Sequence, residues 1–353
     1  MPGQQVTFHS DEVSATSQPG SWMLYGAAGY TGTLIAEHAW QRGHQPLLAG
    51  RSGPAVTALA ERLGLPCREL SLDDPAALAT ALAGVHLVLN AAGPFLHTAT
   101  PLAEACLRAG VHYLDIGNEL QAFRALYDLD ERARDAGVTI MPGAGFGVIA
   151  TNCLARYVSD AVGGAAILEV ATRAATAQQG PGVAVTRQQN MPYGGWIRQA
   201  GHLEPCPLGS GTMEITLPDG PCLIMPLPTG DLEAAFQATG AADITAYGAV
   251  PDAPTPDSKA PDLSVSERPD YLSFGWARAT GPDGSTVQAW LQTGESYAFT
   301  ATASIRAVEE TLARSLSGAF SPAAAFGADF ILTIHGTSRT DTIAAAAPLA
   351  GRP

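Results

Sequence analysis

Lysine is almost missing from this chain of 353 residues: Lys259 is the only one. Three kinds of lysine-dependent chemistry are therefore excluded. The chain has no Tyr-x-x-x-Lys pair and no phosphate-binding loop that ends in Gly-Lys-Ser/Thr. Lys259 itself lies in a proline-rich stretch, where it is a poor candidate for a Schiff-base lysine.

Cysteine pairs, basic charge and long apolar runs are also scarce. The five cysteines are widely spaced without a Cys-x-x-Cys pair, which argues against a disulfide framework and a thiolate zinc site. The histidines show no metal-ligand spacing, so we expect no metal. No run of eighteen apolar residues could span a bilayer, and a net charge of −14 repels nucleic acids and anionic membranes. We expect a cytoplasmic protein that binds neither.

The first part of the chain has the pattern of a parallel sheet. Residues 1–21 are polar and aperiodic, and we interpret them as a disordered leader. From residue 22 onward, short and continuously apolar runs alternate with helical patterns, as is typical of strands buried on both faces. The helical segments end at glycines that can cap a helix in the left-handed conformation: Gly43, Gly64, Gly84, Gly110 and Gly137. We predict an α/β fold with a doubly wound, Rossmann-type domain over 22–143.

The second part has a different pattern, which predicts an α+β domain over 144–317 with a mixed or antiparallel sheet. A helix is expected near 148–162, followed by strand-like runs at 166–174, 211–218, 222–228, 287–293 and 297–305. Pro-Asp-Gly turns at 218–220 and 282–284 are typical of antiparallel hairpins. Residues 250–270 are rich in Pro, Asp and Ser, and we predict a mobile loop there.

Three glycines follow the first apolar run in "YGAAGYTG", residues 25–32. Gly26, Gly29 and Gly32 have the spacing of a dinucleotide-binding turn between a strand and a helix. In that interpretation the first glycine makes the turn, the second admits a pyrophosphate and the third lets the helix pack on the sheet. Ala28, Tyr30 and Thr31 belong to the same predicted cofactor site. The alternative is an ordinary strand-to-helix turn.

The end of the second strand indicates which dinucleotide binds. Where NAD-binding domains carry an acidic residue for the ribose, this chain has Gly50, Arg51 and Ser52. A guanidinium and a hydroxyl suit a 2′-phosphate, so we predict NADP(H), unless Arg51 is simply a solvated surface residue.

The fourth strand ends in "NAAGPF", residues 90–95, at the edge where the nicotinamide half is expected. Small residues there leave room for a ligand, and Pro94 and Phe95 could support the ribose or the ring; core packing of Phe95 is the alternative. The predicted cofactor residues in this segment are Asn90, Ala91, Ala92, Gly93, Pro94 and Phe95.

Together with "LYGAAGYTG", "LLAGRS" and "NAAGPF", the segments "AEACLRAGVHYLDIGNE" (103–119) and "PGAGFG" (142–147) resemble saccharopine dehydrogenase-like oxidoreductases, including trans-acting enoyl reductases. The resemblance implies a nucleotide domain, an inserted mixed-sheet domain, a C-terminal segment (318–353) that returns to the first domain, NAD(P)H as hydride carrier, and frequent homodimers. Such enzymes act on C–N bonds of opine-like amino acids or reduce activated C=C bonds of acyl chains. This chain departs from the family pattern at Gly117, Asn118, Gly147 and Asn152.

Four side chains are candidates for proton transfer or substrate contact. Tyr113, Asp115 and Glu119 follow the fifth strand, and His97 follows the Phe95 turn. The alternatives are a structural cap or a brace for the nicotinamide pocket, and, for His97, helix capping or surface exposure.

In the second domain, Tyr193, Trp196 and Arg198 suit an anionic or acyl substrate, or an ordinary interface. The sequence therefore predicts an NADPH-dependent oxidoreductase that transfers hydride to a C=N or activated C=C bond of a small metabolite or acyl substrate. The alternative is a non-catalytic NADPH-binding sensor.

Overall fold

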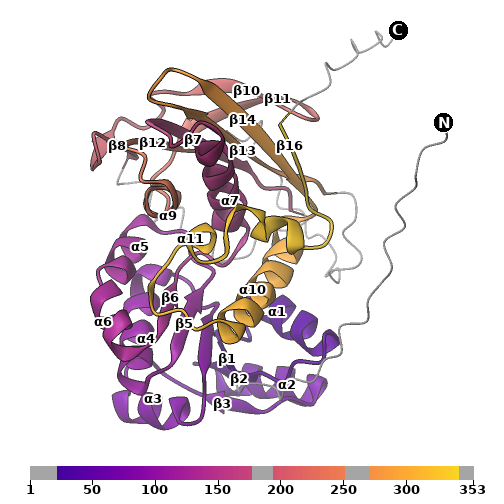
Figure 1. The fold of residues 1–353 in the computed structure, drawn as a ribbon. Coiled ribbons are helices and arrows are strands. Elements are labelled where there is room, and N and C mark those ends of the chain that lie inside the picture. Colours follow the sequence, from indigo (N-terminus) through magenta and orange to yellow (C-terminus); the bar gives the residue numbers. More distant parts are fainter. Residues whose placement is uncertain (1–21, 177–193, 251–270, 342–353) are drawn as a thin grey trace, which may run out of the picture.

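The computed structural model describes residues 22–176, 194–250 and 271–341. The predicted leader, Tyr193 and almost all of the predicted loop lie outside these ranges. Within them the chain forms two sheets with helices between and around them (Figure 1). No helix in the described ranges has the length and apolar character needed to cross a membrane.

The first sheet is parallel and has seven strands in the order β15-β6-β5-β4-β1-β2-β3. The strand order reverses between β1 and β4, which is the switch point where doubly wound sheets bind ligands. The strands are β1 (Trp22–Tyr25), β2 (Leu47–Gly50), β3 (Cys67–Glu69), β4 (Leu87–Asn90), β5 (His112–Asp115), β6 (Thr139–Met141) and β15 (Gly318–Ala319).

Both faces of this sheet are buried except at the exposed edge strand β3, because alternate residues of the inner strands enter different cores. Leu24 and Leu48 pack on one side, and Met23 and Ala49 pack on the other. This confirms the parallel sheet predicted from continuously apolar runs. The connecting helices are α1 (Tyr30–Gln41), α2 (Gly53–Leu63), α3 (Pro75–Leu82), α4 (Phe95–Ala109), α5 (Leu120–Tyr127) and α6 (Asp130–Ala136).

The glycines predicted to end these helices have positive φ angles, between 66° at Gly64 and 81° at Gly43. Gly64, Gly110 and Gly137 are the C-caps of α2, α4 and α6. Each cap turns the chain toward the next strand within a few residues, which produces the alternation of helix and strand.

The second sheet is mixed, as predicted. β12 and β7 are parallel neighbours, whereas the other pairs are antiparallel. Its strands are β7 (Ile167–Arg173), β8 (Gly195–Gln199), β9 (His202–Cys206), β10 (Met213–Leu217), β11 (Gly220–Pro226), β12 (Asp243–Ala249), β13 (Ser273–Thr280), β14 (Thr286–Thr293) and β16 (Ser338–Thr340). The Pro-Asp-Gly turns join β10 to β11 and β13 to β14.

Helices α7 (Phe146–Ala161) and α9 (Asp231–Thr239) lie between the two sheets (Figure 1). The buried side of α7 contacts β7, β13 and β14. The C-terminal segment forms β15 in the first sheet, then α11 (Pro322–Phe326) and the short 3-10 helix η3 (Ala328–Thr333), and finally β16 in the second sheet. The segment therefore connects both sheets.

One predicted strand is wrong. Residues 297–305 belong to the helix α10 (Ser296–Ala313). α10 lies inside the range predicted for the second domain, 144–317, but packs against α1, which covers the first sheet. Most of the buried residues of α10 follow the helical period: Ser296, Phe299, Thr300, Ala303, Ser304, Ala307, Val308 and Thr311; Ala301 and Ile305 are also buried. The β-branched and aromatic residues at its start hid this period, because they favour strands when only a short window is considered.

Candidate cofactor and substrate site

A cavity of about 660 Å³ lies at the carboxyl ends of β1, β2, β4 and β5. Its walls come from the turn after β1, the ends of β2 and β4, the β5–α5 loop and the first turn of α10. Eleven of the predicted cofactor residues line it: Gly26, Ala28, Gly29, Tyr30, Thr31, Arg51, Ser52, Ala91, Ala92, Gly93 and Phe95. Gly32, Asn90 and Pro94 lie outside the lining.

The three glycines of the first turn meet different surroundings. Gly26 has a φ of +81°, and a Cβ on it would lie 2.7 Å from the backbone nitrogen of Ala92. A Cβ on Gly32 would lie 2.1 Å from the carbonyl oxygen of Gly26. A Cβ on Gly29 would meet only that same oxygen, at 3.2 Å. Gly26 thus allows β1 and β4 to approach, Gly32 allows α1 to pack, and Gly29 leaves space on the cavity side.

Several helices begin at this cavity, and α1 and α10 differ in whether a side chain caps their N-terminus. At the start of α10, the amide of Ala298 donates a 2.8 Å hydrogen bond to Glu295 Oε2. At the start of α1, Gly29 has no side chain and supplies no such cap. The positive end of the α1 dipole and its amide groups therefore suit an anionic ligand such as a pyrophosphate.

The end of β2 adds positive charge to the same cavity. Arg51 and Ser52 are exposed and line it. Arg51 has no ion pair with any other residue in the described ranges. A guanidinium next to a hydroxyl suits a phosphate, and no acidic side chain from the described part of the chain lines this end of the cavity.

Asn90 is buried beneath the residues that line the cavity. Its Oδ1 accepts a 2.9 Å hydrogen bond from the amide of Ala92, and its Nδ2 donates to Tyr113 Oη at 3.1 Å and to Thr98 Oγ1 at 3.3 Å. The Thr98 hydroxyl in turn donates to the carbonyl of Ala92 at 2.6 Å. Asn90 therefore holds the loop after β4 in place, and its predicted contact with the cofactor stays a prediction.

Tyr113 and Asp115 are also sealed beneath the cavity and do not line it. The Tyr113 hydroxyl donates to Asp115 Oδ2, and burial raises its pKa well above the ordinary value. Burial also raises the pKa of Asp115, to about 7, although hydrogen bonds from Gly143, Gly117 and Tyr113 oppose this. Of the two alternatives, this geometry favours a brace under the β5 end, and a proton or substrate role for the pair stays a prediction.

Glu119 does line the cavity, but its carboxylate holds the backbone. Oε1 accepts from the amide of Phe95 at 3.3 Å, and Oε2 accepts from the amide of Asn118 at 3.2 Å. Glu119 thereby joins the start of α4 to the β5–α5 loop. His97 is exposed in the first turn of α4 and does not line the cavity, so the structure does not bring it together with the other candidates.

The predicted substrate residues are separated from the cavity. Trp196 is half-buried on β8, outside the lining. Arg198 is buried, pairs with Glu233 at 2.8 Å, donates to the carbonyl of Gly201 at 2.6 Å and stacks over Phe236 at 4.0 Å. These partners lie inside the second domain and favour a structural role for Arg198, whose predicted substrate contact stays a prediction.

Comparison with known proteins agrees with this geometry. Residues 22–141 match the family model described as the saccharopine dehydrogenase NADP-binding domain. This part of the chain is therefore similar to the NADP-binding domain of saccharopine dehydrogenases. The match covers β1 to β6 and includes the glycine turn and Arg51, so the resemblance inferred from the sequence is confirmed for this domain.

Curated relatives extend the likeness only over part of their length. A trans-acting enoyl reductase of Mycobacterium ulcerans is 33% identical over 138 residues, which are 37% of this chain and 33% of the relative. A second protein, from Mycobacterium tuberculosis, whose name assigns the same activity provisionally, is 28% identical over 211 residues, or 51% of this chain and 50% of the relative. The chain thus spans about a third to a half of the relatives it matches.

A solved structure extends the likeness to both sheets. Apo saccharopine dehydrogenase (L-Glu forming) from Saccharomyces cerevisiae superposes with a TM-score of 0.61 and 12% identity, covering 91% of this chain and 99% of that one. At this identity the likeness shows the fold alone. It confirms the predicted combination of a Rossmann-type sheet and a second mixed sheet.

The cavity fits the cofactor of the NADP-binding domain. The uncapped α1 N-terminus would hold the pyrophosphate, and Arg51 and Ser52 would hold the 2′-phosphate. The remaining wall, at the ends of β4 and β5, is where the nicotinamide half would lie.

Sequence analysis missed the residues that complete this wall: Ile116, Gly117 and Asn118 after β5, and Tyr297 and Thr300 from α10. Asn118 Nδ2 donates to Asp231 Oδ2 at 3.1 Å, and a Cβ on Gly147 would lie 3.0 Å from the same nitrogen. Asn118 thus takes the space that a side chain at position 147 would need. The departure from the family pattern at Gly117 and Asn118 was a sequence signal for this part of the wall. No such signal marked Tyr297 and Thr300, because the start of α10 has the pattern of a strand.

Proposed function

We propose that this protein is an NADPH-dependent oxidoreductase that reduces an activated C=C bond of an acyl substrate. The observation that carries the proposal is a cavity in which an uncapped helix N-terminus and Arg51 lie at one end and a largely apolar wall lies at the other. Bound NADPH would supply the hydride.

The character of the far wall favours C=C over C=N reduction. Opine-like amino acids carry carboxylates, which proteins usually bind with arginine or lysine. Among the described lining residues Arg51 is the only basic one, and it belongs to the adenosine end. Around the ends of β4 and β5 the wall consists of Phe95, Ile116, Tyr297 and neutral polar groups, with Glu119 as the one acid among the described residues. This wall suits an uncharged acyl group, in agreement with the activity named for the mycobacterial relatives.

The chain's own residues would act mainly by positioning and by excluding water. Phe95, Ile116 and Tyr297 would cover the reacting atoms with apolar surface, which strengthens electrostatic interactions inside the cavity. Asn90, Tyr113, Asp115 and Glu119 would keep the two strand-end loops fixed. A homodimer and a cytoplasmic location belong to the same proposal.

The test combines binding with isotope transfer. NADPH binding is measured by the enhancement of its fluorescence, with NADH as the comparison. NADPH deuterated at C4 is then incubated with a crotonyl thioester and with a cyclic imine, and mass spectrometry follows the label. We expect the label in the reduced thioester. Label in the amine would instead assign C=N reduction, binding without any transfer would favour the NADPH sensor, and absence of binding would contradict the proposal altogether.

A further inference from the structure

Helices α1 and α10 lie side by side although they are far apart in the sequence (Figure 1). At one end, the rings of Tyr30 and Tyr297 meet edge to face with centroids 4.9 Å apart. At the other end, Arg42 Nη2 donates to Glu309 Oε1 at 2.9 Å. Both pairs are separated by 267 residues in the chain. The two helices therefore run parallel and in register for about three turns.

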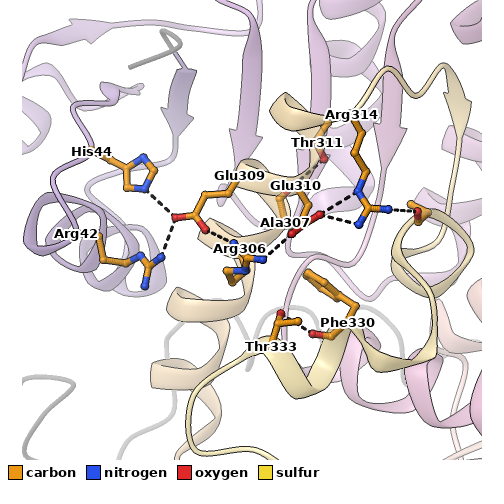
Figure 2. Close-up of polar contacts among 11 residues, drawn as sticks. Arg42, His44, Arg306, Ala307, Glu309, Glu310, Thr311, Arg314, Phe330 and Thr333 are labelled. Atoms are coloured by element: carbon orange, nitrogen blue, oxygen red, sulfur yellow. Dashed lines mark hydrogen bonds and ion pairs between the residues drawn. The ribbon is translucent and has the colours of Figure 1, made fainter. Parts of the chain in front are cut away.

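Glu309 is the centre of the contacts at the far end (Figure 2). Its Oε1 accepts hydrogen bonds from Arg42 and from His44 Nε2, the latter at 3.0 Å, and its Oε2 accepts from Arg306 Nη1 at 2.8 Å. Burial alone raises the pKa of this carboxyl, but the hydrogen bonds from His44, Arg306 and Arg42 outweigh it and bring the pKa to about 2. Glu309 is therefore ionised at neutral pH and joins α10 to the end of α1.

The near end of α10 forms part of the cavity wall. Tyr297 and Thr300 line the cavity, and Thr300 Oγ1 also accepts from the amide of Phe146 at 3.1 Å. Tyr297 is about 18 Å from Glu309 along the helix axis. Because a helix transmits position along its axis, the anchor at Glu309 determines where Tyr297 stands relative to Tyr30, the first residue of α1.

We propose that Glu309 is a positioning residue for NADP(H) binding: its contacts with Arg42 and His44 hold α10 against α1 and so keep Tyr297 in the wall of the cofactor cavity. This rests on the proposed function, and it assigns a role to a residue outside the lining. The neighbouring Glu310 offers a matched contrast. It pairs with Arg306 of α10 and with Arg314, at 2.5 and 2.7 Å, and within the described ranges it has no hydrogen bond or ion pair with α1 (Figure 2).

The test compares Glu309→Gln with Glu310→Gln. Each substitution removes one carboxylate charge from adjacent positions of the same helix. We expect Glu309→Gln to raise the dissociation constant of NADPH about fivefold and Glu310→Gln to leave it unchanged. Tyr297→Ala should also weaken binding, and the double variant Glu309→Gln/Tyr297→Ala should bind no more weakly than Tyr297→Ala alone, because both changes act through the same wall.

A measurement without cofactor separates positioning from general stabilisation. Amide hydrogen exchange in the first turn of α10 should accelerate in Glu309→Gln and not in Glu310→Gln. Equal effects of the two variants on NADPH binding, or no effect of Glu309→Gln, would overturn the role assigned to Glu309 and leave the proposed function intact. If the unaltered protein does not bind NADPH, the proposed function and the assignment both fail.

Discussion

Tyr113 and Asp115 are two residues apart on β5, and the tyrosine hydroxyl donates a 2.9 Å hydrogen bond to Asp115 Oδ2. The other oxygen, Oδ1, accepts from the amides of Gly117 and Gly143 at 2.9 and 3.1 Å. A single buried carboxyl thus ties the end of β5 to the loop that precedes α7. Tyr113 and Asp115 therefore support the cavity wall from beneath the surface that a substrate would touch.

The buried Asp115 carboxyl should make the free energy of unfolding depend on pH. The pKa of Asp115 is about 7 in the folded protein and its ordinary value is 3.8. The folded state therefore holds this proton more tightly, and its contribution to stability is lost as the pH rises from about 4 to about 7. Asp115→Asn keeps an Oδ1 acceptor but cannot ionise. We expect its free energy of unfolding to fall less over this range than that of the unaltered protein, as measured by urea unfolding.

The control for this comparison is Asp135→Asn, which changes an exposed carboxyl on α6. Its pH dependence should match that of the unaltered protein. An identical pH dependence in Asp115→Asn would show that this carboxyl does not carry the effect.

Removal of the Arg51 guanidinium should change cofactor preference. We expect Arg51→Ala to weaken NADPH binding about tenfold to a hundredfold and to leave NADH binding nearly unaltered, because only NADPH has the phosphate that a charge-assisted pair would hold. Fluorescence titration with both cofactors measures the difference. Arg62→Ala on α2 is the control, since Arg62 pairs with Glu37 at 2.7 Å and does not line the cavity. Equal losses for NADPH and NADH in Arg51→Ala would refute the assignment.

A methyl group at Gly32 should displace α1. Its Cβ would lie 2.1 Å from the carbonyl oxygen of Gly26, so the helix must move away from the turn. We expect Gly32→Ala to lower the free energy of unfolding by about 1–3 kcal/mol and to weaken NADPH binding. Gly294→Ala is the matched control, because no heavy atom lies within 4 Å of the added Cβ. Unaltered binding and stability in Gly32→Ala would contradict the close packing of α1 on this turn.

Arg198 should matter for stability and not for cofactor binding. Arg198→Ala leaves the Glu233 carboxylate without its 2.8 Å partner in a largely buried place. We expect a loss of about 3 kcal/mol in the free energy of unfolding, with an unchanged dissociation constant for NADPH. A second change, Glu233→Gln, should restore part of the stability by removing the unpaired charge. A substrate-binding Arg198 would instead show normal stability and impaired turnover.

Much of the cofactor end could be predicted because its signals are local. Gly26, Gly29 and Gly32 are close in sequence. A close backbone contact requires glycine at Gly26 and Gly32, and Gly29 leaves space on the cavity side. Arg51 stands directly after β2, so the strand pattern alone places it at the functional edge. The substrate end could not be predicted in this way, since Tyr297 comes from a helix that the local pattern made look like a strand.

The amino-acid sequence by itself determined the parallel sheet, the glycine turn and the charge at the end of β2, because strand periodicity, helix capping and steric room for a ligand depend on neighbouring residues. Only the tertiary structure decided which polar groups face the cavity. In the folded protein Tyr113 and Asp115 are buried and hydrogen-bonded to each other, and Arg198 pairs with Glu233. The packing of α10 on α1 places Tyr297 against Tyr30. Arg198 and Glu233 are 35 positions apart and Tyr30 and Tyr297 are 267 apart, and no local pattern encodes that such residues will meet.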